Sequence, residues 1–563
     1  MDISAETLVK TNFSTVDWVI VICYPMISVV LGIIAARFVS NMKDFVTAGQ
    51  SLGTALGVAT LTGTELGLIT VMYSAQKGFT GGFAAFHIAL AAGIVTFFVG
   101  ATGFLIYRLR AMEVLTIPEF YRRRFGRKTQ ILGGIMMAFG GILNMGLFLK
   151  VGSMFLVGIT GLTDQNLPLP AAWGLPGIPA LPAIMIFLLS LVLIYTCLGG
   201  MISVVLADYV QFVVLSFGLL LTTVLAIYKL GWTNIFTAVE QLKGAAGFDP
   251  TIAEGGFGVE YIVWMGFLGL IGCSVWPTSV ARALAAESPG TVKKQFMWAS
   301  VSYLIRFLVP YFWGICAYVF IMTLEPQLKE LFFPEAPGAE AVDNLYAMPI
   351  FLGRILPPVI IGIISAGMIA AFMSTHDSYL LCWSSVLTQD VIAPIFGDRL
   401  GPKTRIWLTR VLIVLIGLYV LYWGLLYKGR EDVWDYMAVT GAIYFTGAFA
   451  LLVGGLYWKR ASSTGAVFAL LGGSIAVIGL TPVQDGIGHF FTFVADLVPV
   501  LAGPIMAIPG VSADQIDPNV LHLEIPSARV GLVSIATTVV VMVAGSLLFP
   551  DKKTPDVAAD QGR

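Results

Sequence analysis

Residues 52–75 read LGTALGVATLTGTELGLITVMYSA, an apolar stretch with a single carboxylic acid, Glu65, near its middle. A helix needs about 20 such residues to cross the hydrocarbon core of a bilayer. Glycine weakens a helix, and an interrupted membrane helix is tolerated where its freed carbonyl groups line a polar cavity. The stretch therefore predicts a broken span beside a binding site, or else a span packed tightly through small residues. Four glycines surround the acid: Gly53, Gly57, Gly63 and Gly67.

The whole chain has the composition of a membrane protein. Hydrophobic residues make up 57% of its 563 residues, charged residues make up 12%, and the mean hydropathy is +0.87. A net charge of −1 gives no basic excess that would indicate a nucleic-acid partner. The five cysteines lie in apolar runs without a CxxC pair, so neither disulfides nor zinc is expected. We predict an all-α polytopic protein of the plasma (inner) membrane, in contact with the lipid bilayer.

About 13 apolar stretches are long enough to span the bilayer. With the N-terminus outside, Lys and Arg concentrate in the predicted inner segments, for example at 122–128, as insertion requires. The 350–386 stretch exceeds one crossing, so it either continues beyond the membrane or is broken within it. The apolar segment 489–510 is rich in Pro and Gly, and we interpret it as an outer re-entrant or amphipathic loop; a fourteenth span there would place the C-terminus outside. The predicted spans are 16–37, 52–75, 83–107, 129–160, 180–198, 201–228, 258–281, 296–324, 350–386, 406–427, 433–457, 463–481 and 528–549.

Ionisable side chains within these spans are the strongest functional indicators. Each costs a few kcal/mol in a hydrocarbon environment, so it usually faces the bundle interior or a water-filled cavity. For every one of them, an ion pair or hydrogen bond that only holds helices together is the alternative explanation. The group consists of Glu65, His87, Lys150, Asp208, Arg306, His376 and Asp377.

The ninth predicted span contains the run GMIAAFMSTHDSYLL at 367–381. On a helix, the spacing of Ala371, Ser374 and Thr375 places one carbonyl and two hydroxyl groups on one face. Neutral oxygens suit an alkali ion that must be released in every cycle, because a full carboxylate charge would hold the ion too tightly. Serine and threonine also bond back to their own helix, so this pattern alone leaves both explanations open.

Four stretches resemble, in order, motifs of the sodium:solute symporters. They are DFVTAGQSLGTALGVATLTGTELG (44–67), LTIPEFYRRRFG (115–126), YTCLGGMISVVLADYVQ (195–211) and SAGMIAAFMSTHDSYLLCWSSVLTQDVI (365–392). The resemblance implies a sodium-coupled secondary active symporter that imports a small organic solute by alternating access, and not an enzyme. It also implies a core of two inverted five-helix repeats.

The resemblance places these two repeats at 44–228 and 258–460, separated by an extracellular loop at 229–257. The remaining predicted parts are an outer N-terminus with an extra span at 1–43, two further spans with an outside loop at 461–549, and a cytoplasmic tail at 550–563.

The resemblance also implies site residues. Sodium, the coupling ion, would bind to the carbonyl groups of Gly63, Leu66 and Ala371 and to the hydroxyl groups of Ser374 and Thr375. A second sodium site or the coupling itself would involve Glu65, Asp208, Asp377 and Ser378.

The resemblance places the solute between the broken spans 52–75 and 258–281, with Trp276 as an aromatic gate or a packed aromatic. His87 and Lys150 would lie on the walls of this pocket. Lys150 could face an anionic solute such as a carboxylate, pair with Glu65, or extend to the interface. The solute itself remains open among sugars, amino acids, carboxylates and vitamins.

Other functions remain open from the sequence. A carrier of the same fold could be independent of sodium or use protons, with Glu65, Asp208 or His376 taking the proton. A membrane sensor would need a separate signalling partner. A serine hydrolase is disfavoured because residues 374–377 form one continuous helical run, whereas the members of a catalytic triad converge from separate elements.

Overall fold

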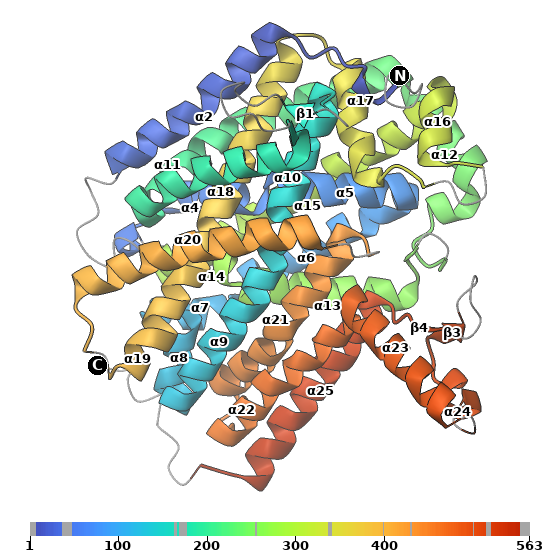
Figure 1. The fold of residues 1–563 in the computed structure, drawn as a ribbon. Coiled ribbons are helices and arrows are strands. Elements are labelled where there is room, and N and C mark those ends of the chain that lie inside the picture. Colours follow the sequence, from blue (N-terminus) through green and yellow to red (C-terminus); the bar gives the residue numbers. More distant parts are fainter. Residues whose placement is uncertain are drawn as a thin grey trace. The chain divides into compact units, whose positions relative to one another are not determined.

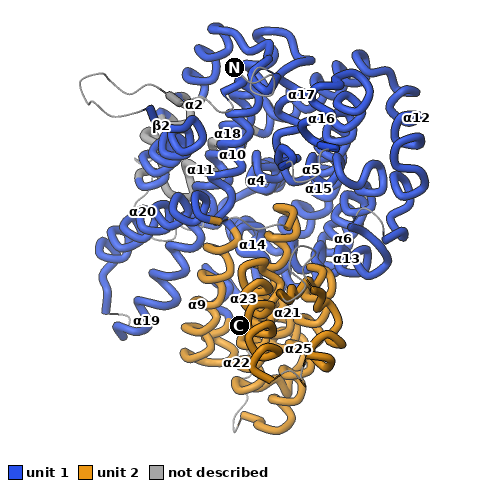
Figure 2. Tube along the Cα trace, turned by 45° about the vertical axis from the view of Figure 1, so that its right-hand side comes forward, with its two compact units in different colours: residues 1–120, 145–426 blue, residues 121–144, 427–563 orange. Residues whose placement is uncertain are grey.

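A computed structural model describes residues 7–35, 48–162, 166–167, 177–253, 256–335, 340–397, 399–427, 431–498, 500, 502–513 and 520–551. Within these ranges, the structure does not describe the side chains of residues 25, 27–29, 31–35, 48, 166–167, 195, 198–208, 210 and 211. The chain forms two compact units, residues 1–120 with 145–426 and residues 121–144 with 427–563 (Figure 2).

The fold is almost entirely helical, as the sequence predicts (Figure 1). Up to residue 230 the helical elements are α2 (Thr15–Ala35), η2 (Ala48–Gln50), α4 (Thr54–Glu65), α5 (Leu68–Gly81), η3 (Gly82–Ala85), α6 (Phe86–Thr102), α7 (Ile106–Ala111), α8 (Ile117–Phe125), α9 (Arg127–Asn144), η4 (Met145–Leu147), α10 (Phe148–Thr160) and α11 (Ala180–Leu230). From residue 231 to residue 395 they are α12 (Trp232–Lys243), η6 (Gly244–Gly247), α13 (Val259–Val275), α14 (Pro277–Ala285), α15 (Pro289–Leu324), α16 (Pro326–Phe332), η8 (Asn344–Tyr346), α17 (Ala347–Ile355), α18 (Ile360–Val386), the π-helix η9 (Leu387–Ile392) and α19 (Ala393–Ile395).

The last part of the chain contains α20 (Pro402–Leu426), α21 (Val433–Tyr457), α22 (Ser463–Gly472), η10 (Gly473–Gly479), α23 (Thr481–Leu497), α24 (Ala502–Met506) and α25 (Ser527–Leu548). Two short antiparallel strand pairs complete the structure. Strand β1 (Asn166–Leu167) pairs with β2 (Ile178–Pro179), and β3 (Val511–Ala513) pairs with β4 (Leu521–Leu523).

The described residues contain eight helical segments that are long and apolar enough to cross a membrane, or up to ten if each of two bent pairs counts as one span. The polytopic helical class is therefore confirmed, whereas the number 13 is not. Two predicted spans have described apolar helices too short to qualify, at Thr15–Tyr24 and Ala180–Ile194. The structure also does not separate the predicted spans 180–198 and 201–228, because α11 is helical throughout. The two glycines between them cost only about 1 kcal/mol each within a helix.

The predicted break in span 52–75 is present between α4 and α5. Leu66 leaves the helical region with φ −97° and ψ 61°, and Gly67 is extended. Span 258–281 breaks in the same way at Trp276, where α13 and α14 meet at 41°. Pro277 explains this second break, because it has no N–H to continue the hydrogen-bond series of the helix. The 350–386 stretch is divided into α17 and α18, with Val359 at a φ of 72°.

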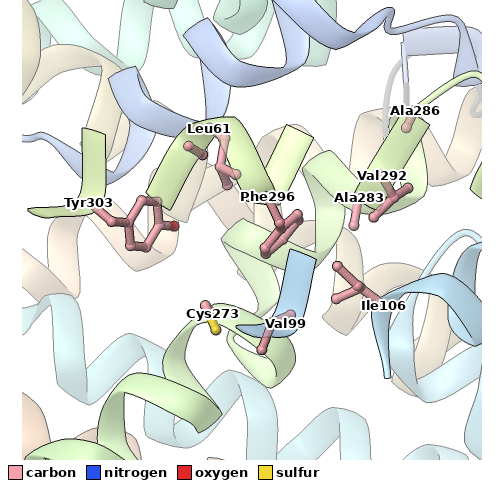
Figure 3. Close-up of a cluster of buried hydrophobic side chains, with 10 residues drawn as sticks. Leu61, Val99, Ile106, Cys273, Ala283, Ala286, Val292, Phe296 and Tyr303 are labelled. Carbon is pink, nitrogen blue, oxygen red and sulfur yellow. The ribbon is translucent and has the colours of Figure 1, made fainter. Parts of the chain in front are cut away.

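A cluster of buried apolar side chains holds α4, α6, α7, α13, α14 and α15 together (Figure 3). Leu61 of α4, Cys273 of α13, Ala283 of α14 and Tyr303 of α15 all belong to it. Each of these residues lies within about one helical turn of a polar residue of the site or of a helix break. The cluster therefore fixes the helices that carry the polar groups described below.

The segment 489–510 begins within α23, which bends by 77° from the preceding helix Ser463–Gly479. Phe490, Phe493 and Leu497 are exposed on this helix. An amphipathic or re-entrant arrangement fits this bend, and the side of the membrane on which it lies stays a prediction.

Candidate functional site

The break in the second predicted span lies directly against α18. The Thr375 hydroxyl group donates to the carbonyl oxygen of Thr64 at 3.4 Å. A Cβ atom on Gly67 would lie 2.0 Å from Thr375 Oγ1, so only glycine permits this approach. The last carbonyl groups of a helix have no partners within it. The last carbonyl oxygens of α4, which includes Gly63, therefore lie near the hydroxyl face of α18; those of Thr62 and Glu65 accept hydrogen bonds from the Leu66 N–H and the Thr70 hydroxyl group.

The predicted face of α18 is buried and helical. Ala371 and Ser374 are fully buried, and Thr375 is 4% exposed. Leu66, at the break, is also buried. The structure thus brings Thr375 to the break, and places the other predicted oxygens on the two elements that meet there.

Glu65 joins the first break to the second. Its Oε1 accepts hydrogen bonds from Thr278 at 2.9 Å and from Ser279 at 2.8 Å, in the first turn after the Trp276 break. Its Oε2 pairs with Arg306 Nη1 of α15 at 3.2 Å. An acid that bridges two interrupted helices ties together the two elements that line the expected solute pathway.

Arg282 forms a second polar bridge around the same break. Its Nη2 donates to Thr64 Oγ1 at 2.5 Å and to Ser378 Oγ of α18 at 2.9 Å. The predicted span 258–281 ends just before Arg282, whereas the helix continues past this residue. Residues 277–285 are helical, and Arg282 is 1% exposed. Its apolar neighbours in the run VARAL (280–284) are the sequence signal that could have revealed its burial.

The remaining polar residues of α18 continue this network. Ser378 donates to Asp377 Oδ1 at 3.2 Å, so Arg282, Ser378 and Asp377 form a chain of contacts. His376 faces aromatic rings: its imidazole lies 3.9 Å from the ring of Phe372 and 5.8 Å from that of Phe148, centroid to centroid. The side chain of Asp208 lies outside the described residues.

Trp276 occupies the break between α13 and α14. Its indole N–H donates to the hydroxyl group of Tyr379 on α18 at 2.9 Å. The ring of Trp383 packs edge-on against it at 5.6 Å. Trp276 therefore contacts the helix that carries the hydroxyl face, which is compatible with a gate and also with a packed aromatic residue.

His87 and Lys150 lie on α6 and α10. His87 lies at the start of α6, with Nδ1 at 2.6 Å from the carbonyl oxygen of Ala84 and its ring against Phe257. Lys150 lies on α10, where its Cβ would be 3.4 Å from a Cβ on Gly424 of α20. The alternative pairing of Lys150 with Glu65 does not occur, because Glu65 binds Arg306 instead.

Sequence reasoning missed several members of this site, namely Thr64, Thr278, Ser279, Arg282 and Tyr379. It had assigned Arg306 no particular partner. Thr278 and Ser279 follow directly after the Trp-Pro pair. A break at a proline exposes the N–H groups of the next helical turn, and this could have identified them as partners for an acid.

The profile of the sodium:solute symporter family matches residues 45–473. The chain belongs to this family. The sodium:solute symporters similar to it include the sodium/glucose cotransporter of Vibrio parahaemolyticus, 23% identical over 485 residues that cover 82% of this chain and 84% of the relative. The sodium/proline symporter of Staphylococcus aureus is 21% identical over 492 residues, which cover 84% and 86% of the two chains.

A solved structure shows that the fold is shared. A sodium-coupled sialic acid symporter in a substrate-bound outward-open state superposes with a TM-score of 0.69 at 16% identity, covering 96% of this chain and 99% of the other. As a member of the sodium:solute symporter family, the protein is a multi-pass plasma-membrane transporter that couples the movement of a small solute to that of sodium.

Proposed function

We propose that the driving sodium ion binds where the α4–α5 break meets α18. Its ligands are the carbonyl oxygens of Gly63, Leu66 and Ala371 and the hydroxyl oxygens of Ser374 and Thr375. The contact between Thr375 and the Thr64 carbonyl supports this proposal, because it brings a hydroxyl group close to the backbone oxygens at the end of α4. Five neutral oxygens suit an ion that must enter and leave in every cycle.

Sodium at this place links binding to conformation. An ion held by both elements favours the state in which the break and α18 stay together, and a ligand shifts an equilibrium only by its preference for one state. In this proposal that state is outward-open and binds the solute. One sodium ion moving inward gains about 2.3 kcal/mol per 100 mV of membrane potential.

The solute is proposed to bind beside the two breaks, next to Trp276, as a small organic molecule that is imported by alternating access without chemical change. Relatives named for glucose, proline and sialic acid support this size and class. Glu65, Asp208, Asp377 and Ser378 are proposed to act in coupling or at a second sodium site. Arg282 already donates to Ser378, so a second ion there would lie beside a fixed positive charge.

The sodium site can be tested without knowledge of the solute. The thermal unfolding of the purified protein is measured in sodium and in potassium at equal ionic strength, because a ligand that binds only the folded state raises its stability. We expect sodium to raise the melting temperature of the wild type. The double variant Ser374→Ala with Thr375→Ala should lose this increase.

Ser384→Ala is the matched control on the same helix. Ser384 is fully buried, and its hydroxyl group bonds to the Leu380 carbonyl of its own helix at 2.6 Å. This variant should keep the sodium effect. A double variant that responds to sodium as the wild type does would refute the assigned site. A wild type that responds to pH but not to sodium would favour proton coupling.

A further inference from the structure

Arg306 uses few of its hydrogen-bond donors, although it is only 8% exposed. Among the described residues it donates one hydrogen bond, from Nη1 to Glu65. Its Nε atom is buried and has no partner there. Arg124, for comparison, donates to the carbonyl groups of Gly455, Lys459 and Ala461, although its Nη1 atom is also buried without a partner among the described residues.

The surroundings of Arg306 leave one edge of its guanidinium group available. The rings of Tyr303 and Phe307 lie against the guanidinium, with centroids 3.8 Å and 4.6 Å from its central carbon. Glu65 occupies the Nη1 end. The Nε–Nη2 edge remains, and this edge is a planar fork that matches a carboxylate with two parallel hydrogen bonds.

The guanidinium group is connected to both helix breaks, beside which the solute is proposed to bind. Arg306 is tied through Glu65 to Thr278 and Ser279, in the turn that follows Trp276. Glu65 itself ends α4 at the first break. The guanidinium group is therefore held by both interrupted helices.

We propose that Arg306 binds the carboxylate group of the transported solute, so that the solute is a small carboxylic acid or an amino acid and not a sugar. This inference rests on the proposed function, and it identifies the solute class of that same site. Glu65 orients the guanidinium group, and Trp276 with Tyr379 packs beside the rest of the solute.

Charge explains why a carboxylic acid anion would need sodium. Glu65 and Arg306 together are neutral, so the bound anion adds one negative charge to a region of low dielectric constant, whereas a zwitterionic amino acid adds no net charge. One sodium ion at the neighbouring break restores neutrality. Each ligand then raises the affinity of the other by the same factor, because coupling between two sites is reciprocal.

The experiment compares acids with their own amides. The melting temperature of the full-length purified protein is measured in sodium and in potassium with acetate, propionate, lactate, benzoate and proline, each beside its primary amide, and with glucose. We expect at least one carboxylate to raise the melting temperature in sodium while its amide does not. Arg306→Lys should weaken that binding roughly 10- to 100-fold, because it keeps the charge and loses the fork.

Two further variants separate recognition from folding. Glu65→Gln with Arg306→Gln removes both charges together, and it should lose the carboxylate effect while it still unfolds in one cooperative transition. Arg354→Lys is the control, because Arg354 also pairs with a glutamate, Glu325, at 2.7 Å, and its Nη2 atom donates to the Thr7 carbonyl. It should leave carboxylate binding unchanged.

The outcomes distinguish this inference from the proposed sodium site. The inference would be overturned if sodium stabilises the protein but only glucose or amides bind, or if no carboxylate binds. The proposed sodium site would still stand in these cases. Carboxylate binding that persists in Arg306→Lys and in the double variant would overturn it as well. Loss of sodium stabilisation in the wild type would instead contradict the proposed function.

Discussion

Gly67 and Thr375 are in such close contact that a single added methyl group would separate them. A Cβ atom on Gly67 would lie 2.0 Å from Thr375 Oγ1 and 2.9 Å from its Cβ. Because Thr375 is β-branched and buried, it has little freedom to move aside. The interrupted span and α18 therefore meet through a glycine.

Gly67→Ala should move the break away from α18. Overpacking of this kind costs about 1–3 kcal/mol of stability, and the displaced oxygens should bind sodium more weakly. Thermal unfolding in sodium and in potassium measures both effects. Gly53→Ala on the same span is the control, because no atom lies within 4 Å of its added Cβ. An unchanged sodium response in Gly67→Ala would contradict the importance of this contact.

Glu65→Gln should destabilise the protein more than removal of both charges does. The single variant leaves the guanidinium group of Arg306 buried without its counter-ion, which costs about 3 kcal/mol. Glu65→Gln with Arg306→Gln should recover part of this loss. Thermal unfolding of the two single variants and the double variant gives the interaction energy. If the stability losses of the two single variants simply add up in the double variant, the 3.2 Å ion pair contributes nothing to stability.

Trp276→Phe should lower stability through one lost hydrogen bond. The indole N–H donates to Tyr379 at 2.9 Å, and its loss costs about 1 kcal/mol beyond the change in packing. Trp383→Phe is the matched control, because the indole nitrogen of Trp383 is buried without a partner among the described residues. If Trp276 gates the solute, its variant should also reduce sodium-driven solute uptake more than the control does. Equal effects of the two variants would favour simple packing.

The burial of Lys243, which lies outside the predicted membrane spans, predicts that the stability of the protein depends on pH. Burial lowers the pKa of its ammonium group to about 8 at the end of α12, where it donates to the Thr80 carbonyl at 2.7 Å and lies 4.0 Å from the ring centroid of Tyr318. In an unfolded chain, lysine titrates near about 10.4. Between these values the unfolded state binds more protons, so stability should rise as the pH increases from about 8 to about 10.4.

Lys243→Met should remove this rise, which thermal unfolding across pH 7 to 10.5 would measure. Below pH 8 the stability of the wild type should not change with pH through this group, because Lys243 is protonated in both the folded and the unfolded state. Lys229→Met, at an exposed lysine near the end of α11, serves as the control and should retain the wild-type slope. An identical slope in Lys243→Met would contradict the effect of burial.

Sequence reasoning predicted the features that depend on local composition. The apolar runs gave the helical membrane class, the glycines near Glu65 gave the broken span, and the spacing of Ala371, Ser374 and Thr375 gave a buried face on α18. It did not predict the partners of the charged groups. The predicted span 258–281 ends one residue before Arg282, because the end of an apolar stretch looks the same whether the helix stops or continues after a proline.

The sequence by itself determined that this chain is a helical membrane transporter, since hydrophobic length, glycine placement and motif order are properties of contiguous residues. The tertiary structure alone decided that Glu65 pairs with Arg306 and not with Lys150, and that Arg282 joins Thr64 to Ser378. Glu65 and Arg306 are 241 positions apart. Contacts at such separations arise from the packing of whole helices against one another, which no local pattern of residues specifies.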